Sequence, residues 1–453
     1  MSFKRQLYSS LQEWKSSSAK KPLILRGARQ VGKTTLVREF SKEFKHHIWL
    51  NLEKDEHKSY FTQYTDVSSI VEALFFGHGI SIEDINKTLL FIDEIQELPK
   101  AIQLLRYFYE ELPELHVISA GSLFEFAMAK VPSFPVGRVE FRYLHPLNFQ
   151  EYLLAKGNDL ALEQLKQTPI KEFAHNTLID LFHEYAIIGG MPEVVKTYLS
   201  SGSISNISAV YESIWATYKN DVEKYGENDT EQKVIKHIIS SAHLFLDKRV
   251  KFQHFGNSNY KSREVGEAFR NLDSAKVIQL IYPTTVNVPP IIPDLKKSPK
   301  LQFLDTGLVV NELSLQTELM KLSDFSESFK GALIPHLITQ ELISLNNSKA
   351  TKPCFWVREK RQSQSELDLV YHYENKLIPI EIKSGKAGTL RSLHQYIEQT
   401  NDNYAVRIYG GKFSIEKHKT INGKEFHLMN LPYYLGTQIP NYIKYLVEEI
   451  KPV

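Results

Sequence analysis

The sequence predicts an α/β protein with a parallel-sheet N-terminal domain, a helical middle segment and a second α/β domain. Apolar strand candidates alternate with helical segments from residue 22 to residue 144. Such alternation is typical of a mostly parallel sheet covered on both faces. From residue 192 to about residue 250 the apolar spacing is that of packed helices. Two strand-like runs rich in carboxylates follow near residues 366–383. We expect domains at 1–195, 196–320 and 321–453.

Composition narrows the class of protein. The chain has 453 residues, 42% of them hydrophobic and 24% charged, as in ordinary globular proteins of two to four domains. With 55 Lys and Arg against 53 Asp and Glu, global charge does not indicate a nucleic-acid coat or a membrane-surface protein. The single cysteine, Cys354, excludes an intramolecular disulfide. Without a signal peptide or an apolar run of roughly 18 residues, we expect a cytoplasmic protein with no membrane partner.

One segment matches a complete phosphate-binding loop. Gly27–Thr34 fits G-x-x-x-x-G-K-[ST] without a mismatch, between an apolar strand and a helical stretch. In such a loop backbone N–H groups wrap the phosphates, the lysine reaches the β- and γ-phosphates and the hydroxyl binds Mg²⁺. We therefore expect ATP and Mg²⁺, with Lys33 and Thr34 in these two roles. The expected nucleotide contacts are Gly27, Ala28, Arg29, Gln30, Val31, Gly32, Lys33, Thr34 and Thr35.

Two carboxylates end the third strand candidate. Thr88–Asp93 is apolar apart from its ends, and Glu94 follows. Ligands of such sheets lie at the carboxyl ends of the strands, so both acids should lie beside the phosphates. We expect Asp93 to hold Mg²⁺ and Glu94 to orient the attacking water. The other strand candidates are Pro22–Arg26, His47–Leu52, His116–Ser119 and Val139–Leu144.

Further candidates flank the last two strands. Ser119 and Ser122, near the end of the fourth, both qualify to contact the γ-phosphate or the water. Arg138, followed by Arg142, opens the fifth strand. An arginine there could stabilise transition-state charge in a neighbouring subunit of a homo-oligomer. The alternative is a surface arginine paired with a nearby acid.

Several phrases of the sequence resemble a prokaryotic group of AAA+ ATPases. They are Gly27–Leu36, Phe91–Gln96, Pro146–Tyr152, Gly189–Pro192 and Phe303–Leu308. The resemblance implies an AAA+ ATPase domain joined to a C-terminal domain of unassigned function. It does not specify a biological role.

The middle segment looks like a winged helix. Ser262 is expected to cap a helix over Arg263–Leu272, followed by strands at Lys276–Tyr282 and Lys300–Leu304. Its second helix could contact DNA phosphates. The alternative is a packing module, because acidic residues interrupt the basic face. The basic residues are Lys261, Arg263 and Arg270, and the acidic ones Glu264, Glu267 and Asp273.

The C-terminal runs predict a β-hairpin with clustered charges. With a turn at Asn375-Lys376, Asp368 lies opposite Lys383 and diagonal to Glu381. All three side chains then share one face of the hairpin. Two carboxylates so placed can bind a divalent metal, Mg²⁺ or Mn²⁺, beside an ammonium that steadies a phosphate or water.

This pattern, preceded by Glu341 on a helix, resembles the PD-(D/E)xK nuclease fold. The resemblance implies Glu341, Asp368 and Glu381 as metal ligands and Lys383 as a catalytic residue, with Gln395 in support. The proline of the first motif is replaced here by Glu366. The alternative is a solvated hairpin whose acids pair with Lys360, Arg361 and Lys383.

Together these features favour a Mg²⁺-dependent ATPase coupled to a DNA-binding or DNA-cleaving module. Two alternatives stay open. One is a nucleotide-dependent switch that acts through protein partners, and the other is a transcriptional regulator that reads DNA through the middle segment.

Overall fold

The computed structural model describes residues 3–450 except 123, 125–127, 129–130, 132, 223–225, 227, 321–330, 350, 359–364 and 384–389. The chain forms two compact units. The first comprises Met1–His145 with the short segments Ser274–Lys276 and Asn346–Ala350. All remaining residues form the second, so this division follows β5 directly, whereas the predicted first domain extends to residue 195.

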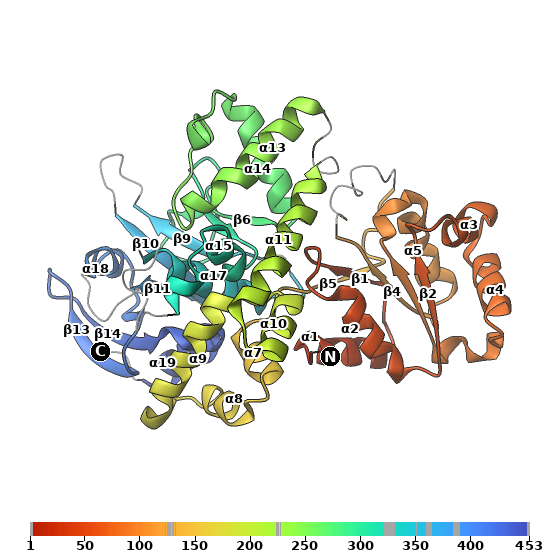
Figure 1. Cartoon of the computed structure of the whole chain (residues 1–453). Coiled ribbons are helices and arrows are strands. Elements are labelled where there is room, and N and C mark those ends of the chain that lie inside the picture. The colour runs from red at the N-terminus through yellow and green to blue at the C-terminus, as the bar shows by residue number, and fades with distance from the viewer. Residues whose placement is uncertain are drawn as a thin grey trace. The chain divides into compact units, whose positions relative to one another are not determined.

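A five-stranded parallel sheet forms the centre of the first unit, in the order β2-β3-β4-β1-β5 (Figure 1). The five predicted strands are confirmed to within one residue at each end. β4 lies between β1, which leads into the phosphate loop, and β3, which ends in Asp93. Because these three strands are parallel, their carboxyl ends meet at one edge of the sheet. The strands are β1 (Leu23–Arg26), β2 (His46–Asn51), β3 (Thr88–Asp93), β4 (His116–Ala120) and β5 (Glu140–Tyr143).

Helices cover both faces of this sheet. One face packs against α3, α4 and α5, where Ile24, Leu50 and Leu90 share a buried cluster with Phe61 and Ile102. Strand side chains alternate between faces, so Leu25 and Phe91 point to the other side. The helices of this unit are α1 (Leu7–Ser16), α2 (Lys33–Phe40), α3 (Asp55–Gln63), α4 (Val67–Gly77) and α5 (Pro99–Glu111).

The second unit begins with a set of packed helices. Two starts follow from capping side chains: Asn148 accepts a hydrogen bond from Glu151 N before α7, and Asp305 accepts one from Gly307 N before α15. The helices are α7 (Phe149–Ala155), α8 (Asp159–Leu165), α9 (His175–Ile188), α10 (Pro192–Ser201), α11 (Ile204–Asn220), α13 (Asp229–Ser241), α14 (Ser262–Ser274), α15 (Thr306–Glu312) and α16 (Gln316–Leu319).

The predicted helix and hairpin of the middle segment are present. β6 (Ile278–Ile281) and β8 (Lys300–Phe303) pair antiparallel after α14. Ser262 is the first residue of α14 rather than its cap, because Val265 N donates to the carbonyl of Lys261. On the predicted basic face, Arg263 pairs with Glu267 at 3.0 Å. The predicted DNA-contacting surface is thus partly neutralised within the helix itself.

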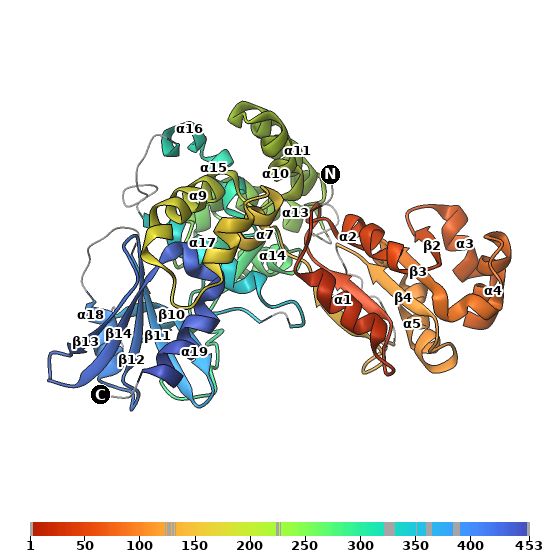
Figure 2. The same ribbon diagram turned by 90° about the horizontal axis from the view of Figure 1, so that it is seen from below.

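A seven-stranded mixed sheet completes the second unit, in the order β13-β14-β12-β11-β10-β9-β7. Figure 2 shows the strands from β10 to β14 side by side. The strands are β7 (Pro283–Thr284), β9 (Cys354–Val357), β10 (Glu366–Tyr373), β11 (Lys376–Ile382), β12 (Tyr404–Tyr409), β13 (Ser414–Lys419) and β14 (Glu425–Pro432). The helices that accompany them are α17 (Leu333–Ser344), α18 (Arg391–Ile397) and α19 (Ile439–Glu449).

The predicted hairpin is confirmed, but its predicted register is wrong by two residues. Tyr373 pairs with Lys376, so the turn is Glu374-Asn375. Glu374 adopts a positive φ of 51°, which lets the two-residue turn close. A shift of two residues keeps every side chain on its predicted face. Continued one pair beyond Leu369 and Ile380, the register sets Asp368 beside Glu381 instead of Lys383.

Candidate functional site

The phosphate loop owes its shape to backbone conformations that favour glycine. Gly27 has φ 149° and Gly32 has φ 95°, both in the region that L-residues rarely adopt. A Cβ at Gly27 would lie 2.3 Å from the carbonyl oxygen of Leu144. Leu144 N in turn donates to Arg26 O. The end of β5 therefore fixes where the loop leaves β1.

Two buried cations hold this loop. The Lys33 ammonium donates to the carbonyls of Gly27 (2.9 Å) and Ala28 (2.8 Å). Arg5, which precedes α1, donates to Val31 O at 3.0 Å and to His145 O at 2.5 Å. No sequence motif marks Arg5, since its partner is a backbone atom 26 residues away. Its burial in an otherwise polar stretch is visible only in the fold.

The predicted magnesium ligands meet. Thr34 Oγ1 donates to Asp93 Oδ2 at 2.9 Å, from the first turn of α2 to the end of β3. Burial raises the pKa of Asp93, and the Thr34 hydrogen bond opposes that shift. A hydroxyl and a carboxylate at one point are the oxygen donors that Mg²⁺ takes in nucleotide sites. These residues therefore fit the ion that the motif implies.

Glu94 follows Asp93 in a left-handed conformation, with φ 50° and ψ 45°. This turn brings its carboxylate to Gln96, whose Nε2 donates to Glu94 Oε2 at 2.5 Å. Gln96 was not among the predicted site residues.

The two serine candidates separate in the structure. Ser119 is fully buried within β4, and its hydroxyl lies 3.4 Å from the carbonyl of Leu23, inside the sheet. Ser122 lies just beyond the end of β4, and its buried hydroxyl has no hydrogen-bond partner in the described part of the chain. The position of Ser122 suits a contact with nucleotide better than that of Ser119.

Both arginine candidates have partners within the same unit. Arg138 Nε contacts Glu110 Oε1 at 2.8 Å, and Arg106 contacts the same carboxylate. Arg142 donates to Ser10, to the carbonyl of Phe141 and to Glu140. The surface-pairing alternative describes this arrangement. The role of Arg138 in a neighbouring subunit stays a prediction.

Loop, parallel sheet and paired acids define the first unit as a P-loop ATPase domain of the AAA type. Comparison with protein families agrees, because residues 19–153 match a family described as "AAA domain". This match supports ATP binding and hydrolysis by the first unit. Residues 179–319 and 330–434 match two families described as domains of unknown function, DUF8612 and DUF4143.

No curated protein matches the chain. Among solved structures, it is similar to a Signal Transduction ATPase with Numerous Domains (STAND) protein with a tetratricopeptide repeat sensor from Pyrococcus horikoshii. The identity is 13% and the TM-score 0.28, over 76% of this chain and 46% of that chain. This chain thus spans less than half of that protein.

The downstream phrases of the family resemblance converge in the second unit. Asp305 accepts hydrogen bonds from Gly190 N (2.6 Å) and Gly307 N (3.0 Å), which joins Gly189–Pro192 to Phe303–Leu308. Leu147 N donates to Gly190 O at 2.7 Å, which adds Pro146–Tyr152. The three segments are thus joined by one buried network of hydrogen bonds.

Glu341 belongs to this network and not to the carboxylates of the hairpin. It accepts hydrogen bonds from Phe149 N and from the Tyr185 hydroxyl at 2.8 Å. Complete burial raises its pKa to about 8. The predicted metal set of Glu341, Asp368 and Glu381 is not assembled: no group of three or more His, Cys, Asp or Glu in the described residues could hold a metal.

The carboxylates of the hairpin do lie together. Asp368 Oδ2 accepts a hydrogen bond from Ile382 N at 2.8 Å, next to Glu381. Lys383 Nζ contacts Glu381 Oε1 at 2.5 Å. Burial, with the charge of Asp368 second, raises the pKa of Glu381 to about 7.

A lysine that the sequence did not single out joins these acids. Lys300 Nζ, on β8, lies 3.1 Å from Glu366, 3.4 Å from Asp368 and 3.8 Å from Asp247. Burial disfavours the ammonium, but the three carboxylates together raise the pKa of Lys300 above its ordinary value. An ammonium thus stands where a divalent ion would have to bind Asp368. The residues present do not fit the predicted second metal in this arrangement.

The supporting candidates are placed in part. Gln395, on α18, accepts a hydrogen bond from Ser365, which directly precedes β10. Lys360 and Arg361 lie outside the described residues.

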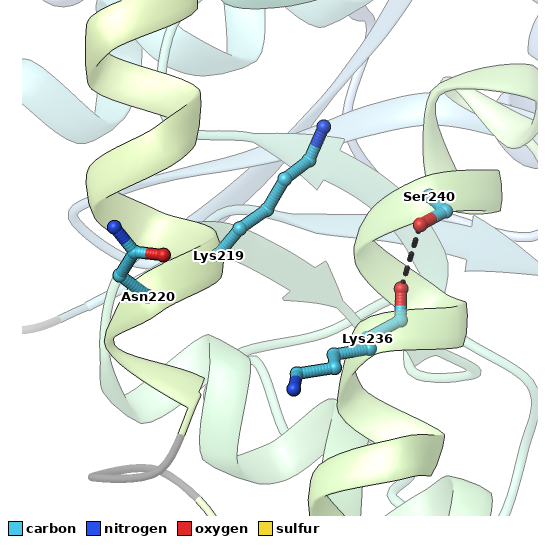
Figure 3. Close-up of a pocket in the computed structure, with 4 residues that line it drawn as sticks. All are labelled: Lys219, Asn220, Lys236 and Ser240. Carbon is cyan, nitrogen blue, oxygen red and sulfur yellow. Dashed lines mark hydrogen bonds between the residues drawn. The ribbon is translucent and has the colours of Figure 1, made fainter.

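The second unit also contains a pocket of about 550 Å³ between α11 and α13. Figure 3 shows its lining side chains, Lys219, Asn220, Lys236 and Ser240. Lys219 lies 3.7 Å from Glu312. Among the described residues, no helix combines the length and apolar character needed to cross a bilayer.

Proposed function

We propose that the chain is a Mg²⁺-dependent ATPase that acts as a switch, in which ATP turnover in the first unit changes how the second unit engages a macromolecular partner. The contact between Thr34 and Asp93, with Glu94 adjacent, is the observation that carries the ATPase site. Lys33 would exchange its two loop carbonyls for the β- and γ-phosphates. Bound Mg²⁺ would neutralise charge on the phosphate oxygens, while Glu94 orients the attacking water.

Two variants test this assignment. Lys33→Ala removes the charge that meets the phosphates, so tight ATP binding should be lost. Glu94→Gln keeps the loop and should leave ATP affinity within about twofold, while kcat falls by roughly 10²–10⁴. Nucleotide titration and phosphate release measure the two quantities. Parent-like turnover by Glu94→Gln would remove Glu94 from the reaction.

DNA cleavage by the second unit is the other candidate function. The observation that favours it is that Asp368 accepts a hydrogen bond from Ile382 N, next to Glu381, and that Lys383 contacts Glu381. The contact of Lys300 with Asp368 counts against it. We expect the protein to cut no DNA with Mg²⁺ or Mn²⁺, with or without ATP. Cutting that is lost in Asp368→Ala and Glu381→Ala, while ATP hydrolysis persists, would establish the nuclease instead.

Arg138 is proposed only as a group that reaches a neighbouring subunit. In that role Arg138→Ala would bind ATP normally and hydrolyse it slowly, and specific activity would rise with protein concentration. Activity independent of concentration down to a demonstrated monomer would leave the pairing with Glu110 as its role.

A further inference from the structure

We infer that Gln96 is a positioning residue for ATP hydrolysis, which holds the Glu94 carboxylate against the segment that follows β4. The inference rests on the proposed role of Glu94. It is drawn from three observations within the first unit. They are the hydrogen bond to Glu94, the packing of the Gln96 amide on Gly121, and the buried polar atoms left beside it.

The first contact fixes the amide orientation. A carboxylate only accepts hydrogen bonds, so Glu94 must face the Nε2 side of Gln96, as it does at 2.5 Å. The left-handed turn at Glu94 makes this contact between residues two apart possible. One carboxylate oxygen is thereby held, and the other is left to accept a hydrogen bond from water. A carboxylate that is already held in place loses less entropy when it reaches the reactive geometry.

The second contact joins the amide to β4. A Cβ added at Gly121 would lie 2.3 Å from Gln96 Oε1 and 3.7 Å from Ile95 Cγ2. Gly121 has no positive φ, so its backbone conformation does not require glycine. The absence of a side chain at Gly121 instead leaves room for the Gln96 amide. Gln96 thus bridges the ends of β3 and β4, the edge where the phosphates are expected.

The third observation is unused hydrogen-bonding capacity at this place. Gln96 Oε1 and the Ser122 hydroxyl are both buried without a partner among the described residues. Buried polar atoms without partners are rare and indicate an unmet contact.

The test combines two substitutions that reach the same contact from opposite sides. Gln96→Ala removes the amide, and we expect kcat to fall about tenfold, the value of one hydrogen bond to a charged group. The Kd for ATP should stay within about twofold. Gly121→Ala displaces the amide and should give the same loss, because only the end of a flexible side chain opposes the new methyl group. Gln63→Ala, an exposed glutamine on α3, is the matched control with unchanged kcat.

The double variant decides the mechanism. If both changes act through one contact, Gln96→Ala with Gly121→Ala should hydrolyse ATP at the rate of Gln96→Ala alone. Multiplied losses in the double variant, or a parent-like kcat in Gln96→Ala, would overturn the inference. Melting curves and ATP affinity separate either outcome from misfolding. Glu94→Gln, measured alongside, shows whether a failure belongs to Gln96 or to the assignment of Glu94.

Discussion

Arg5 supports the phosphate loop although it lies 22 residues before Gly27 and in no motif. Arg5 is 9% exposed, and its guanidinium donates to two carbonyls, one of them inside the loop. Hydrogen bonds from a charged group are worth about 1.5–3 kcal/mol each. The geometry of the loop therefore depends on a side chain that does not touch nucleotide.

Removal of this support should weaken ATP binding. In Arg5→Ala the carbonyl of Val31 loses a charged donor, so we expect the Kd for ATP to rise about tenfold. Fluorescence titration with a labelled nucleotide measures it. The exposed neighbour Lys4→Ala is the matched control and should bind as the parent does. Equal affinities in the two variants would contradict a supporting role.

Lys300 is a second residue whose partners change the interpretation of a predicted site, the metal site of the hairpin. The order of the hairpin acids in the sequence predicts their cluster, but their charge partner, Lys300, comes from β8, 68 residues before Asp368. Nothing in the sequence near Lys300 marks it as buried. Its contact with three carboxylates replaces the predicted metal with an internal cation.

At the scale of elements, the phosphate loop depends on the sheet that flanks it. The end of β5 leaves no room for a side chain at Gly27, because the backbone oxygen of Leu144 lies in its place. The backbone of a strand cannot move aside as a flexible side chain can.

Gly27→Ala should therefore damage the loop severely. The substitution combines an unfavourable φ of 149° with a backbone collision, so we expect ATP binding to be lost and the melting temperature to fall. Gly77→Ala, at the end of α4, is the control, since it has no positive φ and its nearest neighbour is Tyr60 Oη at 3.5 Å. Calorimetry and nucleotide titration compare the two. Normal ATP binding by the Gly27→Ala variant would refute the packing argument.

The hairpin error belongs to this scale as well. Side-chain alternation predicts the face of a residue, whereas the register depends on the turn. A two-residue turn at Glu374-Asn375 places a non-glycine residue, Glu374, at positive φ, and no glycine in the hairpin marks this position.

At the scale of whole units, burial makes stability depend on pH. Folding raises the pKa of Glu341 to about 8 from an ordinary value of 4.5, so the folded chain binds the extra proton between these values. The free energy of unfolding therefore falls as pH rises through this window, by up to about 1.4 kcal/mol per pH unit for one proton.

Glu341→Gln should remove this dependence. A glutamine can still accept from Phe149 and Tyr185, so the variant should lose less stability than the parent between pH 6 and pH 8. Denaturant unfolding at several pH values measures the difference. The exposed Glu163→Gln is the control and should run parallel to the parent. Parallel curves for Glu341→Gln would show that this carboxyl is charged in the folded state.

Lys300 gives the second prediction at this scale. Lys300→Met leaves three carboxylates without their cation, so the second unit should lose about 3–5 kcal/mol of stability. The ATPase kcat of folded protein should not change, because the ATP site and this cluster belong to different units. Mn²⁺ should raise the melting temperature of the variant more than that of the parent. A variant as stable as the parent would mean that these acids are neutral.

The sequence by itself determined the five strands of the parallel sheet, the phosphate loop and the paired acids. These depend on local signals: glycines that permit the loop, apolar runs of strand length, and chemistry placed at strand ends. Only the tertiary structure decided which groups Glu341, Gln96, Lys300 and Arg5 contact. The partners of these residues are distant in sequence or, for Gln96, brought close by the left-handed turn at Glu94. The effect of burial on the charged groups depends on these partners, which the order of residues does not reveal.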